Sequence, residues 1–114
     1  MARYAGIMKS AGKLLRVVEV DEAKLAKRVA AIEKKLRPDV VRIRYDVGEW
    51  MGDPCINFRI VLSEEASGDK TLGPTARRVR EVIVERLDPF ESGLYPYFNF
   101  RGEDEELSRA EGWA

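Results

Sequence analysis

The segment from Leu94 to Arg101, LYPYFNFR, constrains the fold of this chain more than any other. Successive side chains of a strand point to opposite faces of a sheet. Apolar and polar positions alternate here, which predicts a strand with one buried and one outward face. The buried set is Leu94, Pro96, Phe98 and Phe100, and the outward set is Tyr95, Tyr97, Asn99 and Arg101. Because proline has no amide hydrogen to donate, Pro96 favours an edge position in the sheet.

Composition narrows the classes to which the chain can belong. The 114 residues are 45% apolar and 35% charged, as is typical of a single globular domain with its own core. Lysine plus arginine and aspartate plus glutamate number 20 each. The net charge therefore neither favours nor opposes nucleic acid as a partner, and the positions of the charges must decide.

Two residue counts bear on compartment and chemistry. Cys55 is the only cysteine, which excludes an internal disulfide and fits a reducing cytoplasm. The chain has no histidine, so it lacks the commonest general base and the commonest metal ligand. The N-terminal residues contain no long apolar run, which predicts neither a signal peptide nor a membrane span. We expect a cytoplasmic protein without a cofactor.

Two segments carry apolar residues at helical spacing. The first follows Asp21, a good N-cap, and ends before Pro38. The second has Pro74 in its first turn and ends at Asp88 and Pro89. The first apolar stripe is Leu25, Val29, Ile32 and Leu36; the second is Leu72, Ala76, Val79, Ile83 and Leu87.

Between the two predicted helices, residues 41–47 and 56–62 alternate apolar and polar side chains, which predicts two half-buried strands. A short connection with glycines and an Asp-Pro pair joins them, so they are expected to form a hairpin.

The two ends of the chain differ from the middle in composition. Residues 1–12 are small and glycine-punctuated and suggest a leader, and residues 14–20 are rich in β-branched side chains. The latter predict a first strand, with an extended arm as the alternative. Residues 103–114 form an acidic tail that ends near Trp113. We therefore expect a leader with an uncertain first strand over 1–20, an α+β domain over 21–102 and a tail.

The order (strand)–helix–strand–strand–helix–strand predicts an α+β fold. Its expected form is a ferredoxin-like (β)αββαβ sandwich, with an antiparallel sheet and both helices on one face. The opposite face of the sheet would be open, or covered by a second subunit or another partner.

This open face gathers arginines, tyrosines and amides from three strands. A protein interface is the favoured interpretation, because tyrosine and arginine are enriched at interfaces. RNA or single-stranded DNA binding is the alternative, because bases stack on aromatic side chains and phosphates bind cations. The predicted face consists of Arg42, Arg44, Asp46, Asn57, Arg59, Tyr95, Tyr97, Asn99 and Arg101.

Trp50 lies in the predicted hairpin turn and is a further candidate contact residue, unless it folds back over the sheet edge. Asp46, Glu49 and Asp53 supply carboxylates near the same turn, but their spacing does not match a calcium loop. Cys55 has no histidine to activate it, and no phosphate-binding glycine loop is present. No residue is therefore assigned to catalysis or to a metal.

Three segments resemble a family of small, uncharacterised bacterial proteins. They are residues 37–46, residues 52–67 and the run Tyr97–Arg101, and the closing Trp113–Ala114 is similar too. Members of that family are often encoded beside HEPN-domain proteins, a helical class that includes ribonuclease toxins. The resemblance implies a regulatory partner or antitoxin of a HEPN-type protein. The Gly-Ser and paired-aspartate motif of the nucleotidyltransferase antitoxins is absent, so no enzyme activity is carried over.

Overall fold

The computed structural model describes the backbone of residues 2–8 and 16–20 and the complete residues 21–104. Strands β1 (Ala2–Met8) and β2 (Arg16–Asp21) pair antiparallel as a separate two-stranded sheet. Part of the expected leader is thus strand β1. The expected first strand is present as β2, but it pairs with β1 and does not join the three-stranded sheet described below.

Helix α1 (Glu22–Lys35) begins where the sequence predicts. Its N-cap is Asp21, whose Oδ1 accepts a hydrogen bond from the Lys24 amide at 3.0 Å. This bond satisfies one of the backbone amides that the first turn of a helix leaves without a partner. Val29 and Ile32 are the buried residues of α1, and its C-cap residue Leu36 is buried beside them.

The main sheet consists of β3 (Val40–Trp50), β4 (Asp53–Leu62) and β5 (Tyr95–Gly102), in that order. Strands β3 and β4 form the predicted antiparallel hairpin. Met51 and Gly52 turn the chain at its tip with positive φ angles of 51° and 89°.

Strand β5 runs parallel to β4, so the prediction of a wholly antiparallel sheet was wrong. The cause is the connection. Helix α2 (Leu72–Leu87) carries the chain back along the sheet, and a short 3-10 helix at Pro89–Ser92 then leads into β5. A strand, a returning helix and a second strand form a parallel βαβ unit.

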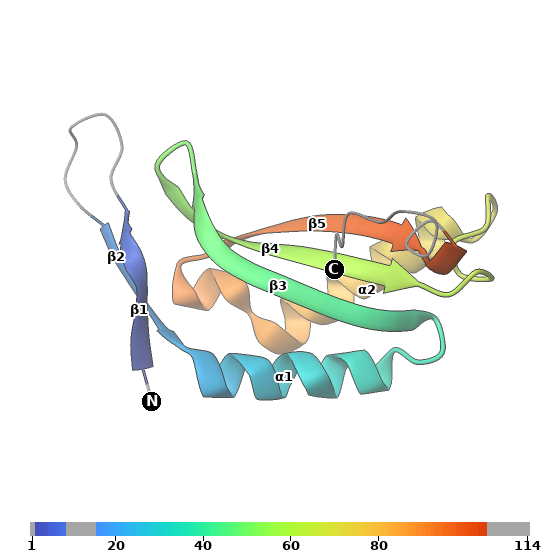
Figure 1. Cartoon of the computed structure of the whole chain (residues 1–114), viewed down its shortest axis with the longest axis horizontal. Coiled ribbons are helices and arrows are strands. Elements are labelled where there is room, and N and C mark those ends of the chain that lie inside the picture. The colour runs from blue at the N-terminus through green and yellow to red at the C-terminus, as the bar shows by residue number, and fades with distance from the viewer. Residues whose placement is uncertain (1, 9–15, 105–114) are drawn as a thin grey trace.

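The fold is α+β, with two helices and a three-stranded mixed sheet among the described elements (Figure 1). A ferredoxin-like arrangement is not confirmed, because the sheet of the described residues has three strands and a parallel pair. Both helices contribute to a single core cluster with the inward residues of the sheet. Its most completely buried side chains are Phe58, Ile56, Ile60, Leu62, Ile83, Val40 and Val79. Among the described residues, no helix is long and apolar enough to cross a membrane.

Candidate functional site: the open face of the sheet

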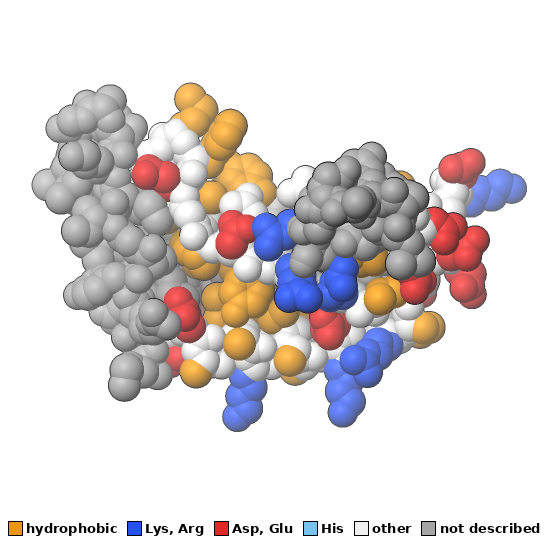
Figure 2. Space-filling view, viewed as in Figure 1, with side chains coloured by type: hydrophobic (Ala, Val, Ile, Leu, Met, Phe, Trp, Pro, Cys, Tyr) orange, Lys and Arg blue, Asp and Glu red, His pale blue; other side chains and the backbone are white. Residues whose placement is uncertain are grey.

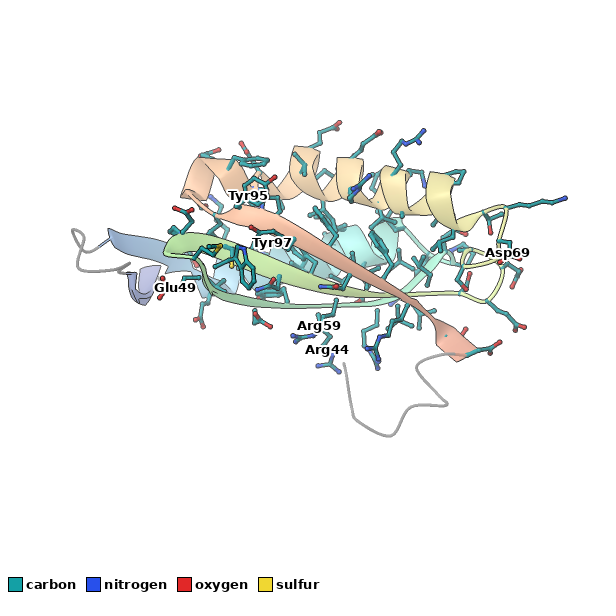
Figure 3. All side chains as sticks on the ribbon, turned by 90° about the horizontal axis from the view of Figure 1, so that it is seen from above. Arg44, Glu49, Arg59, Asp69, Tyr95 and Tyr97 are labelled. Carbon is teal, nitrogen blue, oxygen red and sulfur yellow. The ribbon has the colours of Figure 1, made fainter. Side chains whose placement is uncertain are left out.

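The strand register brings the predicted polar residues together on the face of the sheet that lies opposite the helices. Four rows cross the strands in the order β3, β4, β5. They are Gly48–Cys55–Tyr95, Asp46–Asn57–Tyr97, Arg44–Arg59–Asn99 and Arg42–Val61–Arg101. We call this set, together with Trp50, the open face. It contains the nine residues of the predicted face and Trp50, and Arg44 and Arg59 point away from α2 (Figure 3).

The centre of the open face is a charged network. Arg59 Nη1 donates to Asp46 Oδ2 at 2.5 Å, and Asn57 Nδ2 donates to Asp46 Oδ1 at 3.3 Å. Arg44 stands directly opposite Arg59 on the neighbouring strand, and like charges in that relation repel each other. The Asp46 carboxylate thus lies beside two guanidinium groups, those of Arg44 and Arg59. The net charge of this part of the sheet is therefore positive.

The row of Arg42, Val61 and Arg101 closes one end of the open face. Val61 is buried although it belongs to an outward position of β4, and both arginines are half-buried. This end is therefore less accessible to a partner than the central row and the aromatic end.

The other end of the open face is aromatic. The ring centroids of Tyr95 and Tyr97 lie 5.2 Å apart, and Phe90 meets Tyr95 edge-on at 5.8 Å. Trp50, Tyr95 and Tyr97 remain 61%, 55% and 37% exposed. Hydrophobic side chains project at the tip of the β3–β4 hairpin, and lysine and arginine side chains gather over the middle of the sheet (Figure 2).

A cavity of about 370 Å³ lies within this aromatic end. It is open to solvent, and its walls combine aromatic rings, amides and one carboxylate. The lining residues are Glu49, Trp50, Cys55, Asn57, Tyr97, Phe98 and Asn99. Trp50 is exposed and is one of the residues that line this cavity.

Cys55 has the environment of a structural thiol. Its side chain is 2% exposed, and burial raises the pKa of the thiol above its ordinary value. The Asn57 amide donates to the sulfur at 3.7 Å, which opposes that increase without reversing it. A thiol that stays protonated at neutral pH is a poor nucleophile.

The carboxylates near the turn do not form a metal site. In the part of the chain that the structure describes, no three histidine, cysteine, aspartate or glutamate side chains come close enough to hold an ion. Asp46 is instead engaged by Arg59 and Asn57.

Sequence reasoning overlooked one exposed residue at the aromatic end, Phe90. Phe90 follows Asp88-Pro89, which predicts the end of a helix and the start of a loop. That pattern does not predict the direction in which the side chains of the loop point. Trp113 and the acidic tail beyond residue 104 lie outside the described residues.

A scan against protein-family models and searches of curated proteins and of solved structures found nothing that matches this chain.

Proposed function

We propose that this protein is a non-catalytic, cytoplasmic interaction module that binds a protein partner across the open face. One observation carries the proposal. Exposed aromatic side chains and an arginine-rich row share one face of a sheet whose opposite face is fixed by the core. Large aromatic and arginine side chains supply most of the binding energy at protein interfaces.

The charge pattern favours protein over nucleic acid as the partner. Asp46 offsets the charge of Arg59, and Glu49 lines the cavity beside Trp50. A nucleic acid whose bases stacked on the aromatic side chains would bring its phosphates close to these carboxylates. The negative charges would repel each other. A protein surface with an apolar ridge and acidic groups facing Arg44 complements the open face better.

A double variant tests this proposal. Tyr97→Ala with Arg59→Glu removes one exposed ring and reverses one charge, and neither side chain belongs to the core cluster. The wild-type chain and the variant are each used to isolate the partner from native extract. The partner is then purified, and its affinity for both is measured by calorimetry. We expect the variant to bind at least tenfold more weakly, which corresponds to about 1.4 kcal/mol.

The matched control is Lys27→Glu, a charge reversal on the exposed side of α1. It should bind the partner as the wild type does. Equal affinity for wild type and double variant, with both folded by circular dichroism, would show that the partner binds elsewhere. A HEPN-domain protein is the first partner to test by co-expression, because the sequence resemblance implies it.

RNA or single-stranded DNA is the second candidate ligand, and Tyr95 and Tyr97 are the observation that favours it. Both rings are exposed at alternate positions of β5, next to the row of Arg44 and Arg59. Binding of this kind weakens steeply with salt because counterions are released. Fluorescence anisotropy with mixed-sequence oligonucleotides at low and high salt measures it. No binding at low salt removes this candidate.

A further inference from the structure

Strands β3 and β5 form the two edges of the three-stranded sheet. The two edges differ in how they are protected against pairing with another strand. On β3, the Ile43 amide donates to Glu33 Oε2 of α1 at 2.8 Å. The register of β3 also shifts between Val40 and Arg42. A side chain that occupies an edge amide and a local irregularity are two ways in which proteins prevent strands from pairing edge to edge. The β3 edge is therefore protected.

The β5 edge shows neither of these two features over residues 95–100, and Pro96 is its single edge-protecting residue there. Its eight residues contain one charged side chain, Arg101, at the far end. The inward rings Phe98 and Phe100 pack against the core but remain only partly buried. Phe58, Phe98 and Phe100 form a continuous stack, with centroid distances of 5.3 and 6.4 Å, that leads from the central strand to the edge strand.

The backbone of β5 is suited to accept another strand. The ladder between β4 and β5 continues without a register shift from Cys55↔Tyr95 to Leu62↔Gly102. Pro96 has no hydrogen to give to that ladder, so its nitrogen belongs on the side away from β4. Backbone groups alternate in direction along a strand. The amides of Phe98 and Phe100 therefore point to the same outer side as Pro96 does.

A groove follows this edge between β5 and α2. It is shallow and open, has a volume of about 590 Å³, and has the apolar residues Val84, Pro96 and Phe98 in its lining. The rim on α2 carries both signs of charge within two turns of the helix. The lining residues are Arg80, Glu81, Val84, Glu85, Phe90, Tyr95, Pro96 and Phe98.

The geometry points to a second copy of this chain as the occupant of the β5 edge, with the two β5 strands paired antiparallel about a twofold axis. The mixed rim of the groove is the reason to choose a second copy. A twofold axis turns the α2 helices antiparallel to each other, so the basic part of one rim faces the acidic part of the other. A surface that carries one sign of charge would not complement itself in this way.

This assembly uses a surface that shares only Tyr95, Tyr97, Phe98, Asn99 and Arg101 with the open face and the cavity in it. Side chains that stand opposite each other across a strand pair point to the same face. The two open faces would therefore join into one continuous surface over six strands. The inference does not depend on the proposed partner protein, because the chain alone is sufficient to test it.

The test is the mass of the purified full chain, measured by size-exclusion chromatography with light scattering. We expect twice the monomer mass of 13.0 kDa. A Val84→Lys variant places a charge in the groove and should halve the measured mass. Val41→Lys, the same substitution at an exposed position of the β3 edge, should leave the dimer intact. A wild-type chain that runs as a monomer overturns the inference, and so does a folded Val84→Lys variant that remains a dimer.

A second variant covers the case in which Val84→Lys does not fold. Glu81→Arg with Glu85→Arg changes two exposed side chains and makes the rim wholly basic. Like charges then face each other across the axis, so this variant should be a monomer at low salt and return toward the dimer as salt screens the charges. A dimer at low salt would place the interface on another surface.

Discussion

Arg59 and Asp46 are joined across the β3–β4 hairpin, with 2.5 Å between Nη1 and Oδ2. Asp46 also accepts from Asn57, and it is the only carboxylate among the twelve residues of the four rows that cross the open face. If Asp46 is replaced by a neutral residue, Arg44 and Arg59 therefore face each other without a counter-charge.

The first prediction concerns Asp46→Asn. Both partners of the ion pair are partly exposed to solvent, so the free energy of unfolding should fall by less than about 1 kcal/mol. Added salt should recover part of this loss, because it screens the repulsion between Arg44 and Arg59. Urea unfolding at low and high salt measures both effects. Asp69→Asn, in the loop before α2, is the control, and an identical salt response in the two variants would contradict the prediction.

The second prediction concerns Gly102 at the end of β5. A Cβ atom at this position would lie 2.7 Å from the Ser67 Oγ. That hydroxyl donates to the Ser63 carbonyl at 2.9 Å, so it cannot turn aside without losing a hydrogen bond. Gly102→Ala should lower the free energy of unfolding by about 1–3 kcal/mol, as overpacking does.

Gly48→Ala is the matched control, because a Cβ atom there meets nothing within 4 Å. The two alanine variants are compared by chemical denaturation. Equal stability would show that the loop holding Ser67 moves freely. A Ser67→Gly change should restore most of the stability of the Gly102→Ala variant, because it removes the atoms that the new methyl group meets.

The third prediction concerns pH. The Lys24 amide bonded to the carboxylate lowers the pKa of Asp21 below its ordinary value of 3.8. A group whose pKa is lower in the folded state stabilises the fold above its unfolded pKa, and this contribution is lost as the pH falls through the folded pKa. Asp21→Ala should therefore lower the thermal midpoint at neutral pH, and the difference from wild type should shrink in acid.

Asp21→Asn separates the cap from the charge. Asparagine also caps helices well, so this variant should keep most of the neutral-pH stability of the wild type. Circular dichroism melts over a pH series follow all three chains. If wild type and Asp21→Ala lost stability in parallel on acidification, the cap would not be the titrating contribution.

The sequence was sufficient to predict the faces of the strands but not their neighbours. Alternation along residues 41–47, 56–62 and 94–101 depends only on the burial of one side of a strand. For that reason Arg44, Arg59 and Asn99 share a face in the structure, although the predicted sheet had β5 in the wrong direction. A parallel and an antiparallel partner produce the same alternation, so the pattern cannot distinguish them.

The pairing of β2 with β1 could not be predicted from the sequence, for a related reason. Residues 14–20 carry β-branched side chains but alternate poorly, so the pattern indicates a strand without indicating which sheet it joins. The aromatic end of the open face also depends on a feature that alternation does not encode. The Phe90 side chain reaches Tyr95 because Asp88 and Gly93 adopt positive φ angles of 50° and 78° around the short 3-10 helix.

Strand β4 has a neighbour on each side, whereas β3 and β5 each have one within the three-stranded sheet. Its amides bond alternately to β3 and to β5, so the whole strand is released to exchange only when both flanking strands have separated, whereas β3 and β5 are each released when a single strand pair opens. Slow exchange in β4 would therefore report the global unfolding equilibrium. A molecule that bound across all three strands would be seen instead as a slowing of exchange in β3 and β5.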